Sequence, residues 1–283
     1  MVEKFAKMKG IVFGAGFLGT RIADYLDYNL VGRNEADVLS SSSLSAFLDR
    51  KKPDIVVNAI GKTGRPNIDW CESHREETFQ SNVTAAENLA KSCYERDIYF
   101  VHLGSGCVYR GDNNRNGYSE EDESNLQGQF YAETKILAEK KLKEFPCLQV
   151  RIRMPIDDRP HERNLIDKLV KYSKVLDSQN SMTTVPHMLP ALEVLIERKR
   201  TGVYNFTNHG TISALEIMQM YKKIIEPSHE FEAISLEELD KITVGKRSNC
   251  MLNTDKLRAE GIELPEIHGA VKECLLNYKK HSN

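Results

Sequence analysis

Long hydrophobic runs are missing from this 283-residue sequence. No stretch approaches the ~18 consecutive apolar residues that a membrane-spanning helix requires. The opening stretch MVEKFAKMKG is too short and wrongly flanked for a secretory signal peptide. We therefore expect a cytoplasmic protein without a membrane partner.

Paired cysteines and an excess of one charge are also missing. The net charge is −2, from 39 basic and 41 acidic residues, which gives no electrostatic basis for binding nucleic acid. The cysteines are far apart, without C-x-x-C spacing or a histidine cluster, at positions 71, 93, 107, 147, 250 and 274. This spacing predicts reduced thiols and no metal site.

Short apolar runs alternate with amphipathic stretches along the first part of the chain. The runs that read as strands are 9–14, 28–32, 54–61, 98–104 and 148–154. The stretches that read as helices include 17–27, 78–96 and 131–145. Strands that are apolar on both faces, separated by helices, predict an α/β fold with a doubly wound parallel sheet.

The pattern loosens after residue 155. A polar loop at 157–163 precedes a stretch at 164–175 that looks helical, and a helix at 190–199 leads into a strand at 202–208. We expect a Rossmann domain from residues 1–155 plus about 183–208. A smaller substrate-binding lobe, 156–182 plus 209–283, would close over the carboxyl edge of the sheet.

The first strand runs into Gly14, Gly16 and Gly19, which form G-x-G-x-x-G ahead of a helix. In this context the motif indicates a dinucleotide whose pyrophosphate meets the helix N-terminus. The alternative is a glycine-rich turn without a ligand. Gly32 and Arg33 stand where NAD sites usually carry an acidic residue, and an arginine suits a 2′-phosphate. NADP(H) is therefore favoured, unless Arg33 is only a surface residue.

Tyr131 and Lys135 form Y-x-x-x-K on a predicted helix, one turn apart on the same face. A phenol with a pKa near 10 is a poor acid–base group unless a neighbouring cation stabilises its anion. Lys135 can supply that charge, and Ser105 follows the fourth strand.

These elements together resemble the extended short-chain dehydrogenase/reductases. VVNAIGKTGRPNIDWCESHREET, RIRMPI, NSMT, GVYNFTN and RSNCML narrow the resemblance to nucleotide-sugar reductases related to dTDP-4-dehydrorhamnose reductase. Within that family the chain is most similar to the bifunctional nucleotide-rhamnose synthases of plants, which are 3,5-epimerase/4-reductases. The resemblance covers about residues 8–258.

The resemblance implies an NADPH-dependent reductase with Ser105, Tyr131 and Lys135 as its triad. It implies cofactor contacts at the glycine turn, Arg33 and the end of the third strand: Gly14, Gly16, Phe17, Leu18, Gly19, Arg33, Asn58, Ala59, Ile60 and Gly61, with Tyr131 and Lys135. The expected substrate contacts are Arg65, Asn67, Asn82, Asn164 and Arg247. A surface salt bridge is the alternative for Arg247.

Cys107 stands two residues after Ser105, the spacing of the catalytic cysteine in GDP-fucose synthase, a bifunctional relative in the same superfamily. A 4-ketone acidifies the hydrogens at C3 and C5, and a thiol is a usable proton shuttle near neutrality. The alternative is a small buried hydrophobe. For the second proton group we favour Lys168, one turn beyond Asn164; a solvated helix lysine is the alternative.

The favoured interpretation is a bifunctional enzyme that converts UDP-4-keto-6-deoxy-D-glucose to UDP-L-rhamnose. A 4-reductase without epimerase activity and a non-catalytic NADP-binding regulatory subunit are the alternatives. The resemblance favours UDP over dTDP, although no residue separates the two. An exposed pair of helices beside the sheet would be compatible with a homodimer, so the oligomeric state stays undecided at this point.

Overall fold

The structure, a computed structural model, describes residues 8–282; the opening stretch 1–7 and residue 283 lie outside the described residues. Its centre is a six-stranded parallel sheet in the order β2-β1-β3-β4-β5-β7. The strands are β1 (Gly10–Phe13), β2 (Asn29–Val31), β3 (Ile55–Asn58), β4 (Tyr99–Ser105), β5 (Leu148–Ile152) and β7 (Gly202–Asn205). The predicted doubly wound sheet is confirmed.

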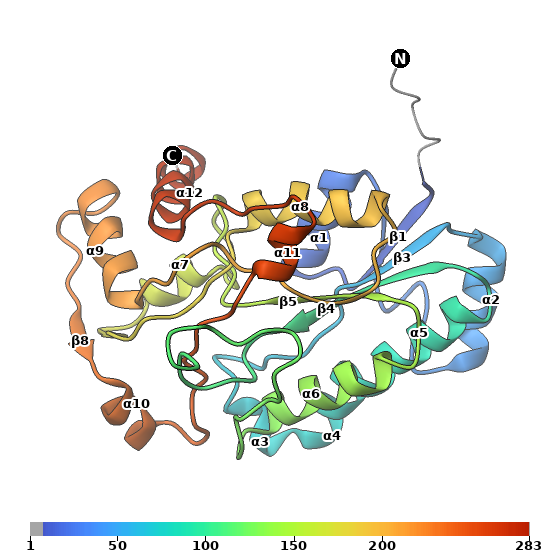
Figure 1. Ribbon diagram of the computed structural model, residues 1–283, viewed down its shortest axis with the longest axis horizontal. Helices are drawn as coiled ribbons and strands as arrows, with labels where there is room; N and C mark the ends of the chain where they lie inside the picture. The colour runs from blue at the N-terminus through green and yellow to red at the C-terminus, as the bar shows by residue number, and fades with distance from the viewer. Residues whose placement is uncertain (1–7, 283) are drawn as a thin grey trace.

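Helices cover both faces of this sheet (Figure 1). Because side chains alternate along a strand, Val12 and Val57 enter one core while Ile11 and Phe13 enter the opposite one. The first core lies under α1 (Phe17–Leu26), α8 (Val185–Glu197) and α11 (Asp255–Ala259). The second lies under α2 (Ser41–Lys51), α5 (Ala85–Tyr94) and α6 (Phe130–Leu142). Two-sided burial explains why the strands are apolar throughout.

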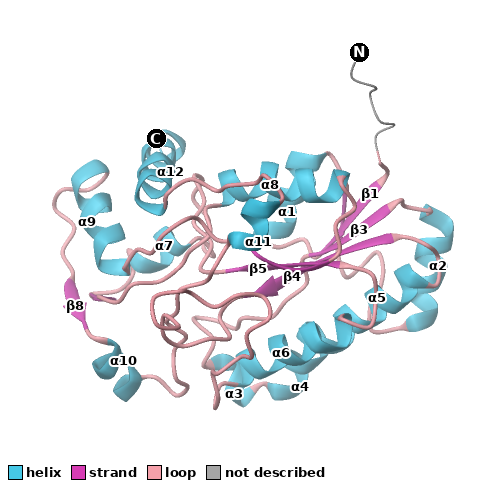
Figure 2. Cartoon of the chain, viewed as in Figure 1, coloured by secondary structure: helices cyan, strands magenta, loops and turns pink. Residues whose placement is uncertain are grey.

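A third core lies beyond the sheet, at the left of Figure 2. It is formed by α7 (Leu165–Leu169), α9 (Ala214–Ile224) and α12 (Ile267–Ser282), beside a two-stranded sheet of β6 (Lys174–Leu176) and β8 (Glu232–Ile234). Its buried side chains fall within 156–182 and 209–283, the ranges expected for the lobe. Leu257, Ile262 and Leu264 fall within the same ranges but pack on the main sheet instead.

One predicted helix is wrong in its extent. The stretch 164–175 forms only the short α7, and the chain then turns into β6. Val175 is buried and β6 pairs with β8, from a distant part of the chain. This pairing overrides the local helical pattern.

The segment before α5 is broken into short helices. α3 (Trp70–Ser73) and α4 (Arg75–Phe79) are followed by a π-helical turn, η1 (Gln80–Thr84). The small α10 (Leu236–Ile242) follows β8. Across residues 8–282, no helix is both long enough and apolar enough to cross a membrane.

Candidate active site

The predicted site residues gather at the carboxyl end of the main sheet. Gly14 follows β1, the loop 59–69 follows β3, Ser105 ends β4, and the loop 153–164 follows β5. In open parallel sheets this edge is where ligands bind.

The glycine turn after β1 fits a dinucleotide. An added Cβ would lie 1.9 Å from the Gly14 carbonyl oxygen at Gly19, but it would meet nothing within 4 Å at Gly16. Gly19 therefore allows close packing of α1 on the strand, while Gly16 borders open space. Gly16 caps α1 without a side-chain hydrogen bond, so the first N–H groups of the helix remain available to an anion.

Other predicted cofactor residues border this turn. The Ala59–Ile60 peptide lies beside Gly14, where an added Cβ would approach it to 2.8 Å. Asn58 is fully buried: its Nδ2 donates to His102 Nδ1 at 3.0 Å and its Oδ1 accepts from the Ile60 amide at 3.0 Å. Asn58 therefore shapes the loop from inside.

Arg33 lies exposed just beyond β2. The neighbouring Glu35 carboxylate accepts from the Gly32 amide at 3.1 Å, which holds the turn that carries Arg33. The guanidinium is thus presented to solvent at the cofactor edge of the sheet.

Ser105, Cys107, Tyr131 and Lys135 come together after β4. Ser105 Oγ accepts from the Cys107 amide at 3.1 Å, and the Ser105 side chain also hydrogen-bonds the Tyr131 phenol. Burial raises the pKa of Tyr131, and the Cys107 thiol raises it further, so the phenol is neutral and can donate a proton. Cys107 is half-buried, whereas Ser105, Tyr131 and Lys135 are buried.

Lys135 is a buried amine, and no ion pair joins it to a carboxylate within residues 8–282. Burial lowers the pKa of Lys135 to about 8, with the Cys107 thiol acting in the opposite direction. Its Nζ donates to the Leu103 carbonyl at 3.4 Å, and an added Cβ on Gly61 would lie 3.5 Å from Nζ. His102, fully buried nearby, has its pKa lowered by burial and by the Lys135 charge, so it is neutral.

Three arginines fasten the loop that follows β3. Arg163 Nη1 donates to Thr63 Oγ1 at 3.1 Å and to the Gly64 carbonyl at 2.7 Å. Arg65 pairs with Glu162 at 2.5 Å in an exposed ion pair, so it points to the neighbouring loop. Arg247 pairs with Asp69 at 2.6 Å, and its Nη2 also reaches Asn67 Oδ1 at 3.4 Å.

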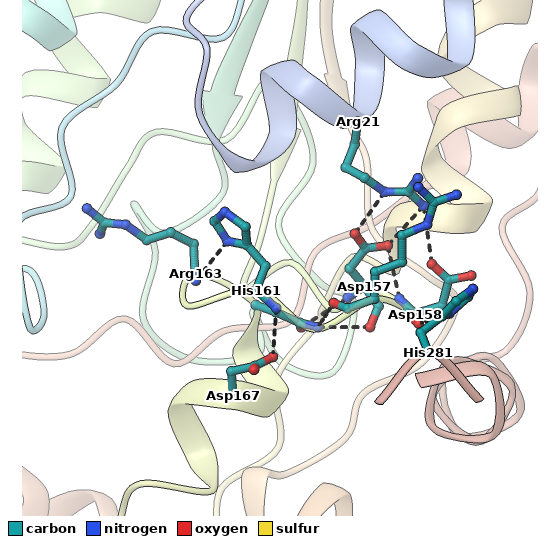
Figure 3. Close-up of polar contacts among 9 residues, drawn as sticks. Arg21, Asp157, Asp158, His161, Arg163, Asp167 and His281 are labelled. Carbon is teal, nitrogen blue, oxygen red and sulfur yellow. Dashed lines mark hydrogen bonds and ion pairs between the residues drawn. The ribbon is translucent and has the colours of Figure 1, made fainter. Parts of the chain in front are cut away.

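The loop after β5, which carries Arg163, is also fastened to α1, as Figure 3 shows. Arg21 forms hydrogen-bonded ion pairs with Asp157 at 2.8 Å and Asp158 at 3.2 Å. The His161 ring stacks on Phe17, the first residue of α1, with the ring centres 4.8 Å apart. The loop 157–164 therefore bridges the glycine turn and the loop after β3.

Asn82 and Asn164, which the sequence predicts as substrate contacts, also have structural roles. Asn82 is buried in η1 and exchanges hydrogen bonds with the Lys62 backbone, while its Nδ2 also donates to Thr134 Oγ1 at 3.0 Å. Asn164 caps α7, and its amide group makes two donor and two acceptor bonds inside its own loop. The side-chain N–H groups of both residues are thus used inside the protein, and their contact with a substrate stays a prediction.

Lys168 is half-buried on α7. Burial lowers the pKa of Lys168, and the Arg163 charge lowers it further. Within the described part of the chain, no hydrogen bond or ion pair joins its amine to the Ser105–Tyr131 group. Its role as the second proton group therefore stays a prediction.

Sequence reasoning missed Arg153, which is buried behind Ser105 and Cys107 and hydrogen-bonded to the Gly106 carbonyl. The signal was a second charged residue in the apolar run LQVRIRM. The cysteines are all free, and residues 8–282 contain no group of His, Cys, Asp or Glu that could hold a metal ion.

A sequence profile of the RmlD substrate binding domain matches residues 8–280. The chain belongs to this family. Among its relatives, the bifunctional dTDP-4-dehydrorhamnose 3,5-epimerase/dTDP-4-dehydrorhamnose reductase of Arabidopsis thaliana is 40% identical over 243 residues, covering 83% of this chain and 79% of that protein. The resemblance predicted from the motifs is therefore confirmed at the level of the family.

Two further RmlD-family comparisons differ in how much of the relative they cover. A trifunctional UDP-glucose 4,6-dehydratase/UDP-4-keto-6-deoxy-D-glucose 3,5-epimerase/UDP-4-keto-L-rhamnose-reductase of Arabidopsis thaliana is 37% identical over 285 residues, but the chain spans only 42% of its length. The crystal structure of the L780 UDP-rhamnose synthase from Acanthamoeba polyphaga mimivirus matches with a TM-score of 0.89 at 31% identity, over 95% of this chain and 99% of that one.

Proposed function

We propose that this protein is an NADPH-dependent bifunctional enzyme that epimerises C3 and C5 of UDP-4-keto-6-deoxy-D-glucose and then reduces C4, giving UDP-L-rhamnose. The observation that carries the proposal is the gathering of a hydroxyl, a thiol, a phenol and a buried amine after β4, at Ser105, Cys107, Tyr131 and Lys135. The bifunctional Arabidopsis relative and the mimivirus UDP-rhamnose synthase support the choice of substrate class.

The cofactor proposal rests on the turn after β1. The open side of Gly16 and the uncapped start of α1 suit a pyrophosphate, and the exposed Arg33 suits a 2′-phosphate by its charge and its fork of donors. When bound, NADPH supplies the hydride that reduces C4.

For the reduction, this chain would supply orientation and a proton. Ser105 donates a hydrogen bond to the C4 carbonyl oxygen, and Tyr131, whose pKa is raised by burial, keeps its proton until the alkoxide needs it. The Lys135 cation then stabilises the phenolate that Tyr131 leaves behind. The low pKa of Lys135 makes this step sensitive to pH.

For the epimerisation, Cys107 would act as the proton shuttle at the ring carbons. Removing a proton next to the C4 ketone leaves an enolate, whose oxygen faces the same donors, Ser105 and Tyr131. The second proton group would be Lys168, because its pKa is lowered by burial. Among residues 8–282 no hydrogen bond or ion pair joins Lys168 to Cys107, so in this assignment the two groups would act on the sugar separately.

We also propose that the lobe built on the third core holds the nucleotide half of the substrate. Arg247, already fastened to the loop after β3 by Asp69, lies where the lobe meets that loop. Exchanging one carboxylate for a diphosphate would keep its bidentate geometry.

Two assays separate the proposed activities. Ring exchange is followed by NMR in D2O with UDP-4-keto-6-deoxyglucose, and reduction is followed by NADPH oxidation with UDP-4-keto-L-rhamnose, which needs no epimerisation. We expect Cys107→Ala to lose ring exchange by about 100-fold or more and to keep reduction within about threefold. Cys274→Ala, a buried thiol in the third core, is the control and should lose neither activity.

The second candidate is a 4-reductase alone, favoured by the observation that, within residues 8–282, no hydrogen bond or ion pair joins Lys168 to Cys107. Wild-type protein that reduces UDP-4-keto-L-rhamnose but exchanges no ring protons would establish it. Equal loss of both activities in Cys107→Ala would show that the thiol supports the site only by packing.

A further inference from the structure

Arg153 is a buried cation whose hydrogen bonds, within residues 8–282, include none to a carboxylate. Only 1% of its surface is exposed. Its guanidinium donates to neutral acceptors: the carbonyls of Gly106 (3.3 Å), Ser181 (3.0 Å) and Ser248 (3.5 Å), Ser248 Oγ (2.6 Å), Cys250 Sγ (3.0 Å), Met154 Sδ (3.8 Å) and Asn180 Oδ1.

The neighbouring Arg151 shows how a buried arginine is ordinarily stabilised, by pairing with a carboxylate. It is equally buried, but it forms a bidentate ion pair with Glu139, with both contacts at 2.7 Å. A buried charge without a counter-charge is strongly disfavoured, and a similar apolar side chain is often more stable. Because Arg153 has no carboxylate partner among residues 8–282, its charge is costly for folding, and this cost indicates that the charge has a function.

The position of Arg153 indicates that use. An added Cβ on Gly106 would lie 3.0 Å from Arg153 Cγ, so the arginine stem packs directly on the turn between Ser105 and Cys107. The same arginine holds the Gly106 carbonyl and, through Ser248, the segment that carries Arg247. Gly106 is required at this point because the Arg153 stem and Leu252 fill the space.

We propose that Arg153 is a positioning residue whose uncompensated charge, behind the Ser105–Gly106–Cys107 turn, stabilises the negative charge that forms on the C4 oxygen of the substrate. The inference rests on the proposed function. The enolate of the epimerisation and the alkoxide of the reduction both place negative charge on this oxygen. A fixed charge in a buried, weakly screened site acts on it without any rearrangement.

The main test neutralises the charge while keeping the arginine. Ser248→Asp would place a carboxylate against the guanidinium, and Ser248→Asn matches it in volume without the charge. We expect Ser248→Asp to lower kcat by about 10- to 100-fold for both ring exchange and reduction, with the KM for NADPH within about threefold. Ser248→Asn and Ser248→Ala should retain kcat within about threefold, because neither neutralises Arg153.

A second pair of variants changes the arginine itself. Arg153→Lys keeps the charge and Arg153→Met removes it. The kcat should therefore fall from the wild type to Arg153→Lys and further to Arg153→Met, while the KM for NADPH changes little. If the wild-type protein turns over substrate but Ser248→Asp and Ser248→Asn have equal kcat, the role of Arg153 is overturned. The proposed function would still stand in that case. If Arg153→Met does not fold, the Ser248 series decides. A wild-type protein without activity on either substrate would overturn the proposed function, and this inference with it.

Discussion

The turns after β1 and β4 lie at the same edge of the sheet and work in opposite ways. At Gly14–Gly19 the proposed cofactor contacts come from the backbone, and the requirement is only the absence of side chains. At Ser105–Cys107 the proposed chemistry belongs to side chains, which come from this turn, from α6 and from Arg153 after β5. The first turn depends on a few neighbouring residues, whereas the second depends on packing across the whole molecule.

The largest expected effect breaks the second turn and leaves the first intact. Tyr131→Phe removes the proton donor, so reduction of UDP-4-keto-L-rhamnose should fall by about 1,000-fold. The affinity for NADPH, measured by fluorescence titration, should stay within about threefold, since phenylalanine keeps the ring and loses only the hydroxyl. Reduction within tenfold of wild type would contradict the role of Tyr131.

The next effect breaks the first turn and leaves the second intact. Gly16→Ala adds a methyl group to the open space proposed for the pyrophosphate. It should therefore weaken NADPH binding by about 100-fold, roughly 3 kcal/mol, without changing the melting temperature. Gly19→Ala is the matched contrast. Its Cβ would lie 1.9 Å from the Gly14 oxygen, so the protein should lose about 1–3 kcal/mol of unfolding free energy. Equal melting temperatures for the two variants would contradict this division.

A smaller effect sharpens the interpretation of the cofactor edge. Arg33→Ala removes the guanidinium at the end of β2, so the KM for NADPH should rise by about tenfold, the equivalent of ~1.4 kcal/mol. The KM for NADH should not change, because NADH has no 2′-phosphate. Arg33→Lys keeps the charge, so its KM for NADPH should lie between those of the wild type and Arg33→Ala. A parallel change in both KM values would show that Arg33 only supports the turn.

The smallest effect is a pH dependence that belongs to the second turn alone. The pKa of Lys135 is lowered to about 8 by burial, so the amine is charged below this pH and neutral above it. Reduction requires the charged form, and kcat should therefore fall as the pH rises through about 8. Lys135→Arg should remove this fall, since a guanidinium keeps its proton. A flat kcat profile up to pH 9 would contradict the assignment.

The sequence predicts the first turn and the sheet well because their signals are local. The strands are apolar on both faces, the glycine spacing lies within one turn, and Tyr131 and Lys135 are one helical turn apart. The early end of α7 was not predictable in this way, because β6 pairs with a strand far along the chain.

The second turn shows why residue type alone is not enough. Asn82 and Asn164 have the right chemistry for a sugar, but the side-chain N–H groups of both already donate inside the protein. Arg153 lies in the motif RIRMPI, but nothing in that run indicates where its side chain lies in the folded chain. Its position depends on three segments, around Gly106, Asn180 and Ser248, which meet only in the folded chain.

The most direct test of the central claim is the isotope content of the product. Wild-type protein, UDP-4-keto-6-deoxyglucose and NADPH are combined in D2O, and the carbon-bound deuterium of the product is located by NMR. If one site both exchanges the ring protons and reduces the ketone, the product is UDP-L-rhamnose with deuterium at C3 and C5 and hydrogen at C4. A reduced product without deuterium at C3 and C5 would contradict the account.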